Sequence, residues 1–282
     1  MFLNSISFIK YFWLYLLVIL PLENMVLERL YVIPHGDEII DMPNKESKQL
    51  HDRIVEVTRG DSSDSIIIVT PHGMTLSSGI PIINTENLHG EYSTKTTKLV
   101  SDHKTDKEIV RNIAAEFGKE MVTVNFATSS GPLSVFPEDF GTIIPLTFFG
   151  KQKLSIISQP RISDTEKLMR LGRNIWNTVD SMEIKISVIF SADQAHTHSK
   201  TGPYGYSDYA KLYEDRIKGY FERGSLQGIE NMEQGMIVEA KTDSYWNMVI
   251  LNGFLKNSGM QVTLDYHYVE NYFGMMLAHG VN

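Results

Sequence analysis

Two histidines occur in the same local sequence, a strand-like run followed by Pro-His-Gly. The first is His35, after residues 30–33, and the second is His72, after residues 65–70. Both runs are short and rich in β-branched residues, so each predicts a buried strand. The proline and the glycine that follow terminate this strand. Open α/β sheets place their sites beyond the carboxyl ends of strands. One such histidine could merely cap a turn, but two favour a metal site or an acid–base pair.

The absence of cysteine limits the ligands that a metal could find in this chain. Histidine and carboxylate ligands remain, and they favour iron, manganese or zinc. Two histidines and one carboxylate on one face of a metal form the facial triad of non-heme iron(II) oxygenases. Glu239 is the candidate carboxylate, because it stands in apolar surroundings before a predicted core helix over residues 239–255. Taken alone, Glu239 is better explained as a helix-start carboxylate that interacts with the helix dipole.

A third strand end carries further polar residues. The predicted strand over residues 184–190 leads into Ser191-Ala192-Asp193-Gln194-Ala195-His196-Thr197-His198. Histidines two residues apart point to opposite sides of an extended chain, so we expect only one of His196 and His198 to face the site. His89 could line the site as well, although a surface turn explains it more simply.

Strand-like and helical segments alternate along most of the chain. Helices are predicted over residues 44–59, 106–118, 164–179 and 208–222, and strands over residues 122–126, 154–157 and 262–268. This alternation predicts a single α/β domain with a central, mostly parallel or mixed sheet, helices on both faces and the site at strand ends. A right-handed crossover between the first two strands would bring His35 and His72 to the same sheet edge.

The first 24 residues differ from the remainder. Residues 11–22 are almost wholly apolar, but Lys10 precedes this run and Pro21 interrupts it, so it is shorter than the roughly 20 residues of a spanning helix. No small-residue cleavage site follows, as a signal peptide would require. We therefore expect residues 1–24 to be a weak anchor or to lie upstream of a translation start at Met25. Residues 25–282 would then form the catalytic domain of a cytoplasmic protein.

Composition narrows the range of partners. The chain has 282 residues, 42% apolar and 21% charged, which is typical of a globular protein with a sizeable core. Its formal net charge is −8 and it has no basic block, so nucleic acid is not an expected partner. A small molecule is the expected partner, and the sequence leaves open whether the chain forms a homo-oligomer.

The ordered set of motifs resembles the class III, or LigB-type, extradiol ring-cleavage dioxygenases. The resemblance runs from about Met25 to the C-terminus, and no single motif is specific to the family. It rests on the following motifs in order: the Pro-His-Gly motifs at His35 and His72, Phe140-Gly141-Thr142 before Pro145-Leu146, Ser-Ala-Asp-x-x-His ending at His196, and Glu239-Ala240.

The resemblance implies a role for each matched residue. His35, His72 and Glu239 would hold iron(II), with zinc as the open alternative, and His196 would be the acid–base catalyst. The implied reaction is cleavage of the aromatic ring of a catechol beside its two hydroxyl groups, with dioxygen as the second substrate. Histidine suits the acid–base role because its ordinary pKa lies near neutrality.

Two other functions are compatible with the same residues. The Memo-like proteins of the same superfamily keep the fold and the histidines but have a cysteine in place of the glutamate, and a metal-binding or scaffold role is the first alternative. A zinc-dependent hydrolase on the same triad is the second. The lack of cysteine and the presence of Glu239 favour the dioxygenases.

The substrate class is the least constrained prediction. Tyr204, Tyr206, Phe140 and Trp246 could supply apolar walls for a ring, but core packing explains each of them equally well. No arginine occurs in the segments assigned to the site, and a substrate carboxylate usually binds a bidentate partner. We therefore expect a neutral or amine-bearing catechol.

Overall fold

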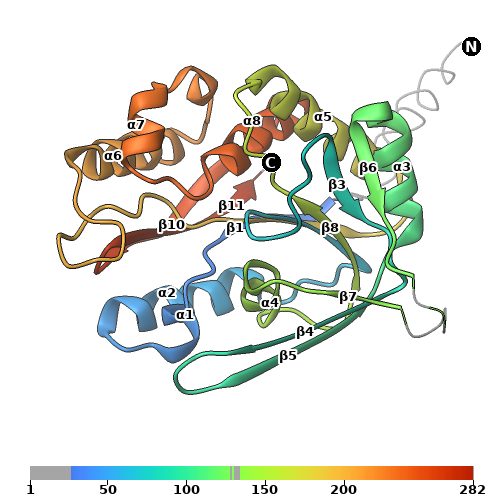
Figure 1. Ribbon diagram of the computed structural model, residues 1–282, viewed down its shortest axis with the longest axis horizontal. Coiled ribbons are helices and arrows are strands. Elements are labelled where there is room, and N and C mark those ends of the chain that lie inside the picture. Colours follow the sequence, from blue (N-terminus) through green and yellow to red (C-terminus); the bar gives the residue numbers. More distant parts are fainter. Residues whose placement is uncertain (1–26, 128, 130–133, 282) are drawn as a thin grey trace, which may run out of the picture.

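The computed structural model describes residues 27–127, 129 and 134–281. The predictions for residues 1–24 lie outside this part of the chain. The described residues form a single α/β domain, as the sequence predicts (Figure 1).

The strands, in chain order, are β1 (Leu27–Ile33), β2 (Ser65–Thr70), β3 (Ile80–Ile83), β4 (Asn87–Ser93), β5 (Lys98–Lys104), β6 (Met121–Val124), β7 (Val135–Pro137), β8 (Lys153–Ser158), β9 (Ile186–Ser191), β10 (Gln261–Glu270) and β11 (Phe273–Val281). The helices are α1 (Glu38–Asp41), α2 (Lys45–Thr58), α3 (Lys107–Phe117), α4 (Phe140–Leu146), α5 (Thr165–Ser181), α6 (Asp208–Glu222), α7 (Gln234–Glu239) and α8 (Tyr245–Ser258), with short 3-10 turns at Gly118–Glu120 and Ile229–Asn231.

The main sheet is mixed and has eight strands in the order β10-β11-β1-β9-β2-β8-β3-β6. Its centre, β1-β9-β2-β8, is parallel, whereas β11 runs antiparallel to β1 and β3 runs antiparallel to β8. β1 and β2 are therefore parallel but not adjacent, since β9 lies between them. The carboxyl ends of the four central strands meet at one edge of the sheet.

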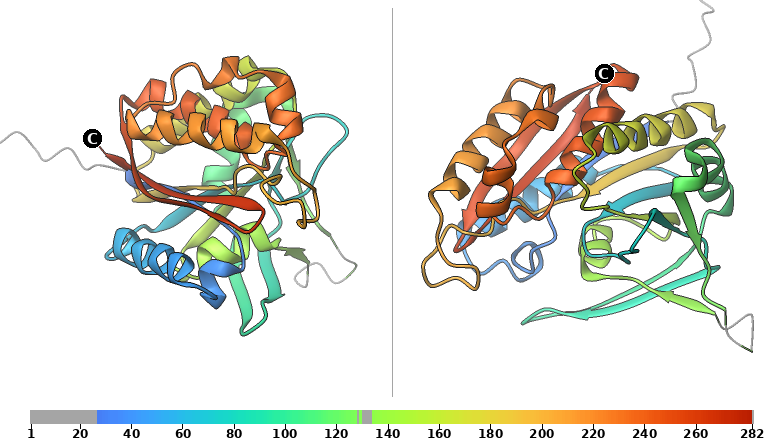
Figure 2. Two further views of the ribbon diagram at one scale, coloured as in Figure 1. Left: turned by 90° about the vertical axis from the view of Figure 1, so that its left-hand side faces the viewer. Right: turned by 45° about the horizontal axis from the view of Figure 1, so that its top comes forward.

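Helices cover both faces of this sheet (Figure 2). Side chains alternate along the central strands: Leu30 and Val32 of β1 belong to one apolar cluster, and Tyr31 and Ile33 belong to the other. The first cluster includes residues of α3, α5, α6, α7 and α8, and the second includes residues of α1, α2, α4 and the smaller sheet. This period of two, with both faces buried, explains why these strands are almost continuously apolar in sequence.

A second sheet, β5-β4-β7, lies outside the predicted alternation. β4 and β5 form an antiparallel hairpin, and β7 pairs with β4 in parallel. Three exposed charged residues of these strands are Glu91, Lys98 and Lys104. Because β4 and β5 are rich in polar residues, their sequence lacks the apolar run that identifies the central strands.

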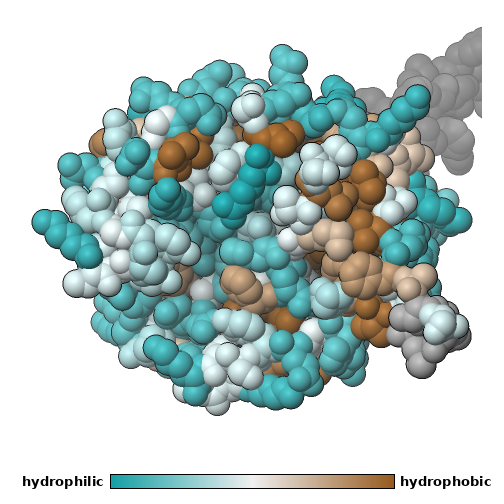
Figure 3. All heavy atoms as spheres, viewed as in Figure 1, coloured by the Kyte–Doolittle hydropathy of each residue, from teal (hydrophilic) through white to brown (hydrophobic). Residues whose placement is uncertain are grey.

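The visible surface is mostly hydrophilic, and apolar residues gather on the right of the view in Figure 3, where β3, β6 and β7 lie. Exposed apolar residues near there include Val122, Phe126 and Val135. Among the helices described, none has both the length and the apolar character needed to cross a membrane.

Candidate metal centre

His35 and His72 reach the same edge of the sheet by equivalent routes. In the sheet, Ile33 of β1 pairs with Ser191 of β9. The β2 residues that precede His72, up to Val69, also pair with β9. Each histidine follows its strand by two residues. Gly73 packs against the Ser158 side chain, and a Cβ there would overlap the serine hydroxyl. A glycine therefore allows the His72 loop to approach the end of β8.

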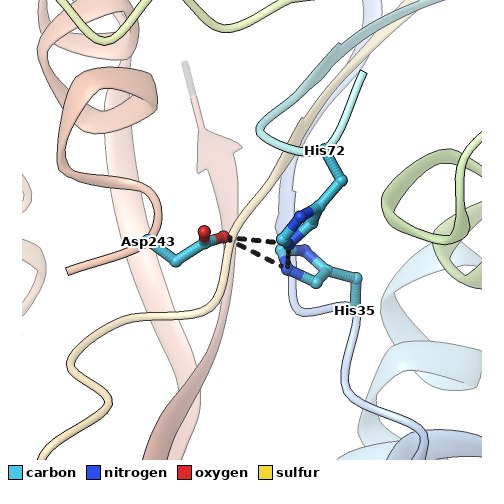
Figure 4. Close-up of side chains that lie close together, drawn as sticks. All are labelled: His35, His72 and Asp243. Atoms are coloured by element: carbon cyan, nitrogen blue, oxygen red, sulfur yellow. Dashed lines mark hydrogen bonds and ion pairs between the residues drawn. The ribbon is translucent and has the colours of Figure 1, made fainter. Parts of the chain in front are cut away.

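Asp243 completes a compact group with these histidines (Figure 4). The Nε2 atoms of His35 and His72 are 3.0 Å apart, and Asp243 Oδ2 lies 3.3 Å from the first and 3.4 Å from the second. Ligand atoms about 2.1 Å from a metal, at angles of about 90 to 109°, lie about 3.0 to 3.4 Å from one another. The three atoms therefore fit one face of a metal ion, as a triad of two histidines and one carboxylate requires.

Hydrogen bonds prepare His35 for ligation. Ser191 Oγ donates to the carbonyl of Gly141 at 2.6 Å, so the serine oxygen is free to accept from His35 Nδ1 at 2.9 Å. The proton on Nδ1 leaves the lone pair of Nε2 facing Asp243. Metal-ligating histidines usually have their second nitrogen held in this way. The Phe140-Gly141-Thr142 motif thus contributes its Gly141 carbonyl to the site, and the Phe140 ring packs on His72 with centroids 4.2 Å apart.

The charges around His35 also favour a bound cation. His35 is 2% exposed, and burial by itself lowers the pKa of its imidazole, but Asp193, Asp243 and Asp139 outweigh this effect and raise it. Burial would raise the pKa of Asp243, yet without a metal the two histidine rings, when protonated, hold that pKa well below its usual range. Buried carboxylates require a positive partner, which a divalent ion could supply.

Glu239, the carboxylate predicted from the sequence, is not part of this group. It is the last residue of α7 and is exposed, and the helix predicted over residues 239–255 begins only at Tyr245, as α8. The chain turns through Lys241, whose φ is +49°, and then presents Asp243 immediately before Ser244, the N-cap of α8. The assignment of Glu239 is therefore corrected to Asp243. Asp-Ser before an apolar run is a helix-start pattern, and it was the available signal for this turn.

An arginine reaches the site, contrary to the sequence-based expectation. Arg161, in the segment after β8, contacts Asp243 Oδ1 through its guanidinium at 2.6 Å and lies over the Trp246 ring at 5.3 Å. With Oδ1 engaged, Asp243 presents Oδ2 to the histidines. Arg161 thus orients the carboxylate for ligation through one oxygen.

His196 lies beside this centre without joining it. Its Nδ1 is 3.0 Å from the carbonyl oxygen of Gln194, which can only accept, so the neutral ring carries its proton on Nδ1 and leaves the lone pair on Nε2. The ring stacks on Phe273 with centroids 5.5 Å apart. When His196 is protonated, its positive charge acts on the carboxyl of Asp193, whose Oδ2 is 3.5 Å from His35 Nε2. Burial raises the pKa of Asp193, although His35 and His196 oppose this shift.

The other candidate histidines point elsewhere. His198 faces the buried Glu214, so His196 and His198 lie on opposite sides of their segment. His89 lies in β4 and pairs with Asp102 at 2.7 Å, with 43% of its side chain exposed. Of the four predicted aromatic wall residues, Phe140 contacts His72, Tyr204 lies edge-on to His196 and Trp246 packs under Arg161.

Fold and site together define a mixed α/β protein with a two-histidine, one-carboxylate group at strand ends. A family model described as the catalytic LigB subunit of aromatic ring-opening dioxygenase matches residues 29–279. The chain therefore belongs to the LigB family, which makes it a member of a ring-cleavage dioxygenase superfamily and agrees with the resemblance found in its motifs.

Two individual proteins are also similar to this chain. Protein CA_C1420 of Clostridium acetobutylicum is 25% identical over 248 residues, a match that covers 82% of this chain and 53% of the relative. The chain thus spans about half the length of the curated relative that it matches. The uncharacterized protein JW3007 of Escherichia coli K12 shares the fold, with a TM-score of 0.62 at 14% identity and coverage of 90% of this chain and 100% of that chain.

Proposed function

We propose that this protein is a non-heme iron(II) extradiol dioxygenase that cleaves the aromatic ring of a catechol. The observation that carries the proposal is the convergence of His35 Nε2, His72 Nε2 and Asp243 Oδ2 within 3.0–3.4 Å at the carboxyl edge of the sheet. Membership of the LigB family supports it independently. Zinc on the same ligands is the alternative metal, because the donor set suits both ions.

Iron(II) held by these three residues would lower the pKa of a bound phenol and bring a catechol and dioxygen together. The chain itself supplies the proton transfers. His196, with its proton on Nδ1, presents Nε2 as the base for a catechol hydroxyl and afterwards as the acid. Asp193, buried between His35 and His196, stabilises a positive charge on the His196 ring during this exchange.

Aromatic side chains give the site its walls. Phe140 packs against His72 in a tilted arrangement and stacks on Tyr92, with centroids 4.2 and 5.6 Å apart, and Tyr204 and Tyr272 flank His196. Such rings exclude water and favour a planar aromatic substrate.

Charge near the site favours a neutral or amine-bearing catechol. Glu38 follows His35 by three residues, and burial, together with Glu270, Asp193 and Asp37, raises the pKa of its carboxyl to about 7. Arg161 is engaged by Asp243, so its charge is already neutralised. A negatively charged substituent would therefore meet more acidic than free basic groups.

The test is anaerobic reconstitution with iron(II), followed by oxygen and a panel of neutral, amine-bearing and carboxylated catechols. We expect oxygen uptake and a yellow ring-opened product, strongest with the neutral or amine-bearing members. Bound iron with no oxygen uptake across the panel would contradict the proposal and favour the Memo-like binding role. Hydrolysis of an ester or amide panel by the zinc form, without oxygen uptake, would favour a hydrolase.

A further inference from the structure

Glu214 is a buried carboxylate that no step of the proposed reaction uses. It lies in α6 and is 3% exposed. Its Oε1 accepts the backbone N–H of Ala195 at 3.0 Å, and its Oε2 is 2.7 Å from His267 Nε2 on β10. His198 Nε2 lies 3.5 Å from Oε1 on a third side. One carboxylate therefore ties together α6, β10 and the segment that carries His196.

The fold is shaped to receive this carboxylate. Gly274 of β11 lies directly against it, and a Cβ at this position would overlap Oε1. The same glycine donates its N–H to the Ala195 carbonyl and accepts the Gln194 N–H. Burial would raise the pKa of Glu214, but His198, His267 and the Ala195 N–H together lower it, so the group is ionised where it lies. A charged carboxylate that accepts a backbone N–H makes one of the stronger hydrogen bonds in proteins.

The peptide unit that Glu214 holds is directly connected to the candidate site. Ala195 N–H and the Gln194 carbonyl belong to one planar peptide, and in the trans form they point in opposite directions. Glu214 binds the N–H side. On the other side, the Gln194 oxygen accepts from His196 Nδ1 at 3.0 Å and from the backbone N–H of Asp243 at 3.1 Å.

We infer that Glu214 is a positioning residue, which fixes the Gln194–Ala195 peptide and thereby sets the tautomer of His196 and the backbone position of Asp243. A rotated peptide would remove the acceptor that keeps the His196 proton on Nδ1. The His196 proton would then be found on Nδ1 in some molecules and on Nε2 in others, so Nε2 would no longer always be the unprotonated nitrogen. The same rotation would release the turn that carries Asp243. Only the expected effect on turnover rests on the proposed function; the tautomer of His196 and the position of Asp243 do not depend on it.

The decisive measurement is the tautomer of His196, read from its ¹⁵N shifts in the full-length protein labelled at histidine, with and without added zinc as a diamagnetic probe. We expect the Nδ1–H form in the wild type and a mixture of both tautomers in Glu214→Ala. The conservative Glu214→Gln variant keeps an oxygen for the Ala195 N–H, so it should retain the wild-type tautomer. Turnover should fall by about tenfold or more in the alanine variant, the usual scale for an outer partner of a metal site.

Glu230→Ala is the matched control, because Glu230 also accepts from a backbone N–H and two side chains but contacts neither site segment. If Glu214→Ala does not fold, Glu214→Leu takes its place, since leucine fills much of the space but has no acceptor for the Ala195 N–H. A folded alanine or leucine variant that keeps the Nδ1–H tautomer would overturn the inference. The tautomer can be read even if no catechol is ever cleaved, so failure of the proposed function remains distinguishable.

Discussion

The strand ends and the turn between α7 and α8 supply the proposed metal ligands in different ways. His35 and His72 each follow by two residues a strand that is buried over its last four residues and pairs in parallel with β9, and the sheet register determines where they lie. Asp243 comes from a turn between two helices, and it is held by Arg161, by the Ser244 hydroxyl at 3.1 Å and by its backbone N–H to Gln194. Strand-borne ligands thus depend on the sheet, whereas the carboxylate depends on polar contacts that single substitutions can remove.

The largest effect is expected at the strand ends. His35→Ala or His72→Ala removes a ligand that no neighbouring group can replace, so metal affinity should fall by more than the roughly 10- to 100-fold that follows loss of an outer partner. Elemental analysis of the purified variants measures this, and circular dichroism shows whether they fold. His89→Ala is the control, since His89 lies on β4 and pairs with Asp102. Full metal content in either ligand variant would remove that histidine from the site.

His196 sharpens the comparison because it lies near the ligands without being one. His196→Ala should keep its metal and lose about 10²- to 10⁴-fold in turnover, the usual contribution of an acid–base group. Metal content and oxygen uptake are measured on the same sample. Loss of metal in this variant would show that His196 is a ligand and would contradict the role proposed for it.

The contacts of the turn should have an intermediate effect. Arg161→Ala frees Asp243 Oδ1, so metal affinity should weaken by about 10- to 100-fold, and Arg161→Lys should restore part of it. Competition with a chromogenic chelator gives the affinities. Arg111→Ala is a suitable control because Arg111 is exposed on α3. Unchanged affinity in Arg161→Ala would mean that the turn holds Asp243 without this arginine.

The smallest expected effect is on the free energy of unfolding, through the carboxyl of Glu38 near the end of β1. Burial raises the folded pKa of Glu38 to about 7, while the unfolded value is about 4.3. The folded protein therefore loses stability from this group as pH rises from about 4.3 to about 7, and Glu38→Gln should be free of this loss. Thermal unfolding of the metal-free protein should show the variant gaining stability over the wild type at pH 8 and not at pH 4. Equal differences at both pH values would contradict the assignment.

The difference between the two regions also explains what the sequence could predict. His35 and His72 follow apolar runs of β-branched residues, a local signal that places both the strand and its end. The mixed sheet and the main helices follow from the same kind of pattern. The polar strands of the small sheet lack it, and so were not predicted.

The carboxylate was misplaced for a physical reason. Residues 234–258 have a nearly continuous helical pattern, which conceals the break at Ala240–Ser244 and the left-handed Lys241. Arg161 was missed because it reaches Asp243 across 82 residues of sequence, and no local pattern encodes such a contact. Long-range polar contacts of this kind become visible only in the folded chain.

The central claim, that Asp243 and not Glu239 completes the metal site, is tested most directly by metal content in Asp243→Asn and Glu239→Gln. Both variants exchange one carboxylate for an amide of the same shape, and the two positions are only four residues apart. We expect Asp243→Asn to lose most of its bound metal and Glu239→Gln to retain the wild-type amount. Metal retained in Asp243→Asn and lost in Glu239→Gln would contradict this account.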